Sequence, residues 1–191
     1  YAMDACRGDY LFHVDSDMLF YRTGERSWIY DGLDLLARES RVIVATPQGG
    51  PPQARNWLER LTGRSFEPKP ASDWHHADFV STRYFLMDVA RFHACLPLEQ
   101  AKPGEPLENS FSHTFARKGY ARWSMNGYTH WAIHPWRHDA NYVRHLDDLI
   151  WAVENGIYPF RRTGFQWDMR TEGEHIEEWL AVLRRHGRGQ G

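Results

Sequence analysis

Two carboxylates spaced two residues apart, Asp15 and Asp17, directly follow a run of aromatic and aliphatic residues in this chain. That run, residues 10–14, has the pattern of a strand buried on both faces. Side chains at positions i and i+2 of an extended chain lie on one face, about 6–7 Å apart. Both carboxylates can therefore reach one hard cation, and carboxylate oxygens suit Mg²⁺ or Mn²⁺. Such sites commonly leave coordination positions for substrate phosphates, so the sequence predicts a metal site that holds a nucleotide diphosphate.

An Asp-X-Asp pattern by itself commonly marks a turn or a solvated loop, and its position after a buried-type strand is what favours a metal site. Two phosphate chemistries use such a strand end. Phosphatases of the HAD type require Thr or Val two residues after the second Asp, where this chain has Leu19. Glycosyltransferases of the GT-A fold instead have hydrophobic residues on both sides of Asp-X-Asp. The stretch resembles the latter, and among them the family 2-like enzymes.

A second segment is similar to the same family. Residues 108–120 read Glu-Asn-Ser-Phe-Ser-His-Thr-Phe-Ala-Arg-Lys-Gly-Tyr. Family 2-like enzymes have an acidic pair at the start of a helix here, followed by Arg and then by Gly with Tyr or Phe. The second acid of that pair is Asn109 in this chain, so Glu108 is the only carboxylate left for the role of general base. A carboxylate at a helix N-terminus also has a structural explanation, because the helix dipole stabilises it by about 0.3–1 kcal/mol.

Four further residues are candidates by position. In similar glycosyltransferases a strand before a short helix lines the acceptor cleft, which places Arg83 at the site, although a surface salt bridge explains this residue equally well. Some GT-A enzymes take a third metal ligand from a His near the end of the catalytic core. His134 is the first choice for that ligand and His138 is the second. Arg137 is placed to meet an oxygen of the diphosphate.

The resemblance implies an α/β, GT-A type layered fold, with a mixed central sheet flanked by helices. It implies that residues 1–140 are the C-terminal part of a catalytic domain and that 141–191 are a helical extension ending in a disordered tail, 186–191. The N-terminal half, with the pocket for the nucleotide base, is then missing from this chain, which would be inactive alone. The implied activity is metal-dependent transfer of a sugar, with inversion, from a nucleotide-diphosphate sugar to a hydroxyl of a glycan, lipid-linked or other acceptor.

Composition sets wider limits. The net charge of −2 does not favour binding to nucleic acid. The two cysteines, Cys6 and Cys95, are too few for a disulfide scaffold, and free thiols in a reducing cytosol are expected. No apolar run approaches the roughly 20 residues needed to cross a bilayer. A cytoplasmic protein, or one peripheral at the membrane, is therefore expected. Two other classes stay open: a metal-dependent phosphoryl hydrolase, and a non-catalytic carbohydrate-binding or scaffold protein that uses its many aromatic side chains.

Hydrophobic periodicity places these residues on elements. The loop over residues 47–52 is interpreted as a connector and residues 67–76 as irregular. The adjacent His75 and His76 are not expected to share a metal, since neighbouring side chains point apart. The pattern predicts helices over residues 27–38, 54–61, 107–119, 145–154 and 173–185, and strands over residues 41–46, 78–87 and 121–133.

Overall fold

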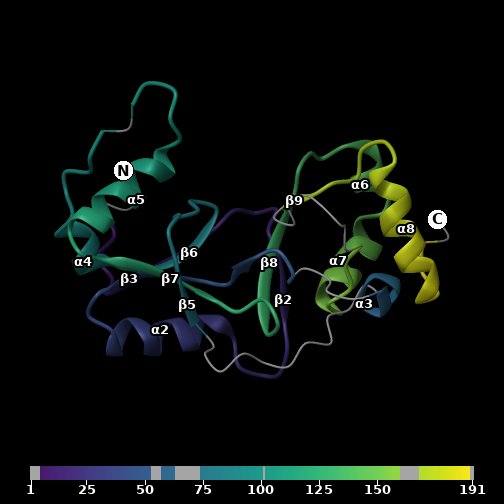
Figure 1. Cartoon of the computed structure of the whole chain (residues 1–191), viewed down its shortest axis with the longest axis horizontal. Coiled ribbons are helices and arrows are strands. Elements are labelled where there is room, and N and C mark those ends of the chain that lie inside the picture. Colours follow the sequence, from purple (N-terminus) through teal and green to yellow (C-terminus); the bar gives the residue numbers. More distant parts are fainter. Residues whose placement is uncertain (1–4, 53–56, 63–73, 101, 160–167, 190–191) are drawn as a thin grey trace. The chain divides into compact units, whose positions relative to one another are not determined.

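The fold is α/β, with two mixed sheets and flanking helices (Figure 1). A computed structural model describes residues 5–52, 57–62, 74–100, 102–159 and 168–189. The chain divides into two compact units that alternate along the sequence. The first unit consists of residues 1–16, 25–47 and 72–125, and the second of residues 17–24, 48–71 and 126–191.

The first unit contains a five-stranded sheet in the order β1-β6-β3-β7-β5. Strands β3 and β7 are parallel, and the other neighbouring pairs are antiparallel. Strand β3 is buried along its whole length, as its unbroken apolar sequence predicts. The strands are β1 (Tyr10–Val14), β3 (Val42–Thr46), β5 (Trp74–Ala77), β6 (Tyr84–Asp88) and β7 (Ala121–Met125).

Strand β1 lies at an edge of this sheet, and the prediction that it is buried on both faces is wrong. Its alternate side chains Tyr10, Phe12 and Val14 are 36%, 44% and 37% exposed. The apolar run described a strand correctly. Burial on both faces would need other elements packed over each face, and the face that carries these three side chains is left partly uncovered. In the described part of the chain β1 is an edge strand, paired only with β6.

Helices α2 (Trp28–Arg38) and α5 (Leu107–Arg117) cover opposite faces of this sheet. Gly32 brings α2 close to the sheet, since a Cβ there would lie 3.0 Å from Leu86 Cδ2 and 3.3 Å from Ala45 Cβ. Helix α5 packs on the other face, where Phe111 and Phe115 share a core with Val44, Phe85 and Met87. These three are chain neighbours of Ala45 and Leu86, and neighbouring side chains of a strand point to opposite faces. The short helix α4 (Val89–His93) follows β6 directly, and the Asp88 carboxylate caps it by accepting from Arg91 N.

The second unit contains a sheet in the order β2-β8-β4, with β9 paired to β8. Strand β2 is antiparallel to β8, and β4 and β9 are parallel to it. The helices of this unit supply most of its core, with Leu149, Trp179 and Leu183 almost fully buried. The elements are β2 (Leu19–Arg22), β4 (Gln48–Gly49), β8 (His130–Pro135), β9 (Asp168–Met169), α3 (Trp57–Thr62), α6 (Ala140–Arg144), α7 (Leu146–Glu154) and α8 (His175–Arg185).

The structure corrects several predicted elements. The expected single segment 121–133 is two strands, β7 and β8, which belong to different sheets and are separated by a turn at 126–129. Residues 74–77, expected to be irregular, form β5. Strand β6 begins at Tyr84, six residues later than the predicted start at residue 78. In each case the deciding hydrogen bonds come from a strand that is distant in sequence, which local periodicity does not report.

Other expectations are met or changed in detail. Helices α2, α5 and α8 match their predictions within two residues, and Gly119 ends α5 with φ 78°. Four apolar helix positions are not in the core: Leu107 of α5 is 59% exposed, and Trp57, Leu58 and Leu61 of α3 are 73%, 42% and 44% exposed. Residues 186–189 continue past α8, with the Gly189 amide donating to Asp148 Oδ2. Ala54 and residues 190–191 lie outside the described part.

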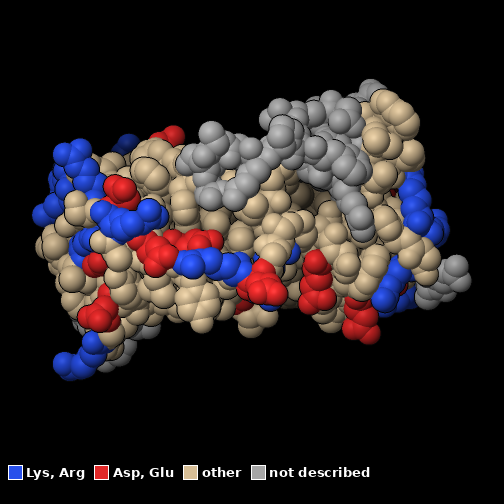
Figure 2. All heavy atoms as spheres, turned by 90° about the horizontal axis from the view of Figure 1, so that it is seen from below, with Lys and Arg blue, Asp and Glu red and all other residues tan. Residues whose placement is uncertain are grey.

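The surface carries charges of both signs. Figure 2 shows acidic and basic side chains interspersed on one face, as the near-balanced net charge predicts. On α2, for example, the Arg26 guanidinium pairs with both Asp31 and Asp34. Both cysteines are free. No helix within the described residues is long and apolar enough to cross a membrane.

Candidate functional site

The first part of the candidate site is the end of β1. The amide of Asp15 donates to the Arg83 carbonyl oxygen at 2.7 Å, which continues the β1–β6 pairing by one residue. Arg83 Nη1 lies 3.9 Å from Asp15 Oδ2, and His13 Nε2 lies 3.2 Å from Asp15 Oδ1. The Asp15 carboxylate is 40% exposed. Its contact with Arg83 is therefore long and solvated, of the kind that contributes little to stability and rearranges readily.

Glu108 reaches the same edge of the sheet from α5. Its Oε1 accepts a 2.6 Å hydrogen bond from the Thr82 hydroxyl, and Thr82 immediately precedes Arg83. Helix α5 has no side-chain cap at Pro106, so Glu108 sits in an uncapped first turn and binds a neighbouring loop rather than its own helix end. A second bond joins the same loop to α5, from the Val80 amide to Ser112 Oγ. Contacts thus run without a break from Asp15 through Arg83 and Thr82 to Glu108.

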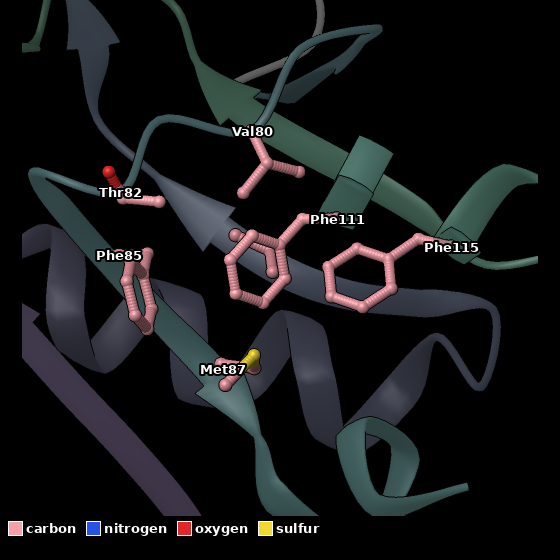
Figure 3. A pocket seen from close by; sticks show the side chains of 7 residues that line it. Val80, Thr82, Phe85, Met87, Phe111 and Phe115 are labelled. Atoms are coloured by element: carbon pink, nitrogen blue, oxygen red, sulfur yellow. The ribbon is translucent and has the colours of Figure 1, made fainter. Parts of the chain in front are cut away.

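An apolar recess adjoins this set of contacts, between α5 and the sheet (Figure 3). It is small, with a cavity volume of about 10 Å³, roughly the room that one water molecule needs. Thr82 is the one lining residue with a polar side chain, and it is also the hydrogen-bond donor to Glu108. The lining residues are Val44, Val80, Thr82, Phe85, Met87, Phe111 and Phe115.

Asp17, the other half of the predicted metal pair, is the first residue of the second unit, whereas Asp15 belongs to the first. The structure places His138 beside it, with Nε2 3.4 Å from Asp17 Oδ2. The His138 ring in turn lies 5.4 Å from the ring of Tyr142, centroid to centroid. Burial, and secondarily the charge of Asp17, raises the pKa of Tyr142 above its usual value. Asp17, His138 and Tyr142 therefore form one local group.

His134, the first choice for a third metal ligand, has a different partner. It faces Asp168 across the β8–β9 pair, with Nε2 2.6 Å from Asp168 Oδ1, and both side chains are largely buried. Its Nδ1 lies 2.9 Å from the Pro135 carbonyl oxygen, which can only accept. Both ring nitrogens of His134 therefore already have partners within the β8–β9 pair. The second choice, His138, is the histidine that the structure brings to Asp17.

The donor types at Asp15 and Asp17, carboxylate oxygens with imidazole nearby, suit Mn²⁺ or Mg²⁺. In the described part of the chain, however, no three or more His, Cys, Asp or Glu residues form a group that could hold a metal. Arg137 is exposed, and it forms no ion pair with any residue that the structure describes. A metal at either carboxylate would therefore depend on substrate oxygens for the rest of its coordination shell.

Sequence reasoning missed two residues of these groups, Thr82 and Asp168. Each has a role only through a partner on another element, Glu108 for Thr82 and His134 for Asp168. The polar Ser-Thr-Arg triplet before an apolar strand was the one available signal for Thr82. The sequence offers none for Asp168.

No model of a known protein family and no curated protein matches this chain. Fold and site together define an α/β protein with two mixed sheets, in which a carboxylate-bearing strand end lies beside a carboxylate-bearing helix.

Proposed function

We propose that this chain belongs to a metal-dependent glycosyltransferase of the GT-A type, which moves a sugar from a nucleotide-diphosphate donor to an acceptor hydroxyl with inversion. The observation that carries the proposal is the unbroken set of contacts from Asp15 through Arg83 and Thr82 to Glu108. It lies at the carboxyl end of β1, and in open α/β sheets ligands bind outside the carboxyl ends of strands. Asp15, Arg83 and Glu108 were selected from the sequence for one reaction, and these contacts make them neighbours.

The proposed donor side is the Asp15–Asp17 segment, whose carboxylates would hold Mn²⁺ or Mg²⁺, and His138 is a candidate ligand beside Asp17. When bound, such an ion neutralises negative charge on the departing diphosphate. Arg83 supplies a positive charge at the same strand end. Because its contact with Asp15 is 3.9 Å long and half-exposed, the guanidinium can turn to a phosphate oxygen at small cost.

The proposed acceptor side is Glu108. Its role is to take the proton of the acceptor hydroxyl as the oxygen attacks the anomeric carbon. The Thr82 hydroxyl occupies Oε1 and fixes the plane of the carboxylate, while Oε2 has no partner among the described residues. A base that is oriented through one oxygen and open at the other has the geometry that proton transfer requires.

The first test measures metal binding by calorimetry, with and without a nucleoside diphosphate. We expect weak binding of Mn²⁺ alone and clearly tighter binding with the diphosphate, because two carboxylates supply too few ligands for a tight site. Asp17→Asn should abolish this gain, and Asp147→Asn, on the exposed side of α7, should leave it unchanged. Tight Mn²⁺ binding to the ligand-free protein that survives Asp17→Asn would contradict the metal assignment.

The second test measures turnover of nucleotide sugars in the natural protein. Release of nucleoside diphosphate that depends on an added hydroxyl acceptor indicates transfer. Release of phosphate without an acceptor would indicate a phosphoryl hydrolase instead. Metal-independent sugar binding that is unaffected by Asp15→Ala, with no turnover, would indicate a non-catalytic carbohydrate-binding protein.

A further inference from the structure

Arg122, on β7, is a largely buried cation that the proposed reaction does not use. Its Nε is buried and has no hydrogen-bond partner. Among the described residues, its side chain makes one hydrogen bond, from Nη2 to the Thr46 hydroxyl at 3.1 Å. A guanidinium carries five N–H donors, so most of its hydrogen-bonding capacity is unused.

The acceptor that Arg122 does have is neutral, and it is committed to a chain of hydrogen bonds. Ser124 Oγ donates to the Pro47 carbonyl oxygen at 3.0 Å, which uses its one hydrogen. In the 3.2 Å contact between the two hydroxyls, Thr46 must therefore be the donor and Ser124 the acceptor. Each donor in this series of hydrogen bonds therefore points away from Arg122 and toward Pro47. The series contains only neutral groups, so it supplies no negative charge to the guanidinium.

Among the described residues, nothing else around Arg122 compensates its charge. No carboxylate within the described residues forms an ion pair with it, and the titratable groups that interact with it are Tyr84 and His75. Burial lowers the pKa of Arg122 from its usual value, with Tyr84 opposing. Burial first and the charge of Arg122 second lower the pKa of His75. The His75 imidazole therefore lies in the positive electrostatic potential of Arg122.

We infer that Arg122 anchors an oxyanion-binding site on the α5-covered face of the five-stranded sheet, which takes a phosphate or carboxylate group of a small molecule. The guanidinium presents Nε–H and an Nη–H side by side, which matches two oxygens of either group. A desolvated cation with one neutral acceptor is costly, and a bound anion removes that cost. Arg122 is paired in register with Val44, whose side chain lies on the α5-covered face, so the guanidinium belongs to that same face.

This inference is independent of the proposed glycosyl transfer. The competing explanation is structural, with an ordered water on Nε and no ligand. The two explanations differ in whether added anion changes the protein, and they are separated in metal-free buffer containing a chelator. Asp15 and Asp17 then hold no metal, and a failure of the proposed function does not affect the result.

The experiment titrates inorganic phosphate, acetate and a nucleoside diphosphate against the chain, with sodium chloride at equal ionic strength as reference. The readouts are the NMR resonance of Arg122 Nε–H and the pKa of the His75 imidazole. We expect a saturable shift of the Nε–H resonance with at least one oxyanion and not with chloride, together with a rise in the His75 pKa as the positive charge is neutralised. The anion that produces the shift tells whether the site takes a phosphate or a carboxylate group. No saturable shift with any of the three would overturn the inference.

Variants provide the second measurement. Arg122→Gln should weaken oxyanion binding by about tenfold or more, because the substitution removes a charge-assisted hydrogen bond to the anion. Arg41→Gln, an exposed Arg of the same unit, should leave binding unchanged. In anion-free buffer Arg122→Gln should not lower the melting temperature, because it removes an uncompensated charge. If it lowers the melting temperature more than Arg41→Gln does, the fold itself satisfies the guanidinium and the inference is wrong.

Discussion

Replacing Glu108 by Gln separates a catalytic role from a structural one. The substitution keeps the size of the side chain and an oxygen that can accept from Thr82, but it removes the negative charge. If Glu108 is the general base, turnover should fall by about 10²–10⁴-fold, because the amide cannot take a proton. Donor binding should stay nearly unchanged, since the proposed donor groups lie at the end of β1 and beyond.

The structural cost can be worked out from the contacts of Glu108. The lost charge no longer interacts with the dipole of α5, which is worth about 0.3–1 kcal/mol. The 2.6 Å bond from Thr82 changes from a charge-assisted to a neutral one, a difference of about 1 kcal/mol for a partly exposed pair. The total stays below about 2 kcal/mol, and in a chain of this size each kcal/mol lowers the melting temperature by about 2–4 °C.

The assay measures kcat for the proposed transfer and the melting temperature on the same Glu108→Gln protein. Thr82→Val is the matched control: it deletes the hydroxyl that binds Glu108 but leaves the carboxylate ionisable. We expect Thr82→Val to lower the melting temperature about as much as Glu108→Gln does, and to reduce kcat far less. A Glu108→Gln protein with kcat within about threefold of the native value and a lowered melting temperature would refute the reasoning. Glu108 would then be a residue that fastens the loop before β6 to α5.

Three further predictions concern other parts of the molecule. His138→Ala should weaken diphosphate-dependent Mn²⁺ binding by about tenfold or more, and His134→Gln should leave it unchanged while lowering the melting temperature; the opposite result would restore His134 as the ligand. Gly156→Ala should lower the free energy of unfolding, measured with denaturant, by at least about 2 kcal/mol more than Gly173→Ala does. Both glycines have a positive φ, but only at Gly156 would an added Cβ meet a ring, 2.6 Å from Tyr21 Cε2. The pKa of His75 is lowered from its usual 6.5, so below that pH the unfolded chain binds more protons than the folded one and stability falls as the pH falls. His75→Gln should flatten the stability profile between about pH 5 and 7 in urea titrations, and an unchanged slope would show that other groups set it.

The sequence by itself determined the elements that depend on local interactions. The apolar spacing of α5 and α8, the capping of α2 by Ser27 and the glycine stop at Gly119 are all set within a few residues of chain. Strand β3 was equally clear, since its run of small aliphatic residues is typical of a central strand with both faces covered. Asp15, Arg83 and Glu108 were also selected from sequence, on motif spacing and resemblance.

Tertiary structure alone decided which of these elements and side chains meet. Sheet neighbours join residues distant in the chain, so periodicity could not tell that β1 is an edge strand or that β7 and β8 belong to different sheets. The same holds for side-chain partners. The sequence favoured His134 over His138 as a ligand, and only the pairing of β9 with β8 assigns His134 to Asp168. Arg122 looked like an ordinary strand residue in the sequence. Among the described residues it is buried without a carboxylate partner. Pairing between distant strands decides this, because it determines which side chains lie on that face.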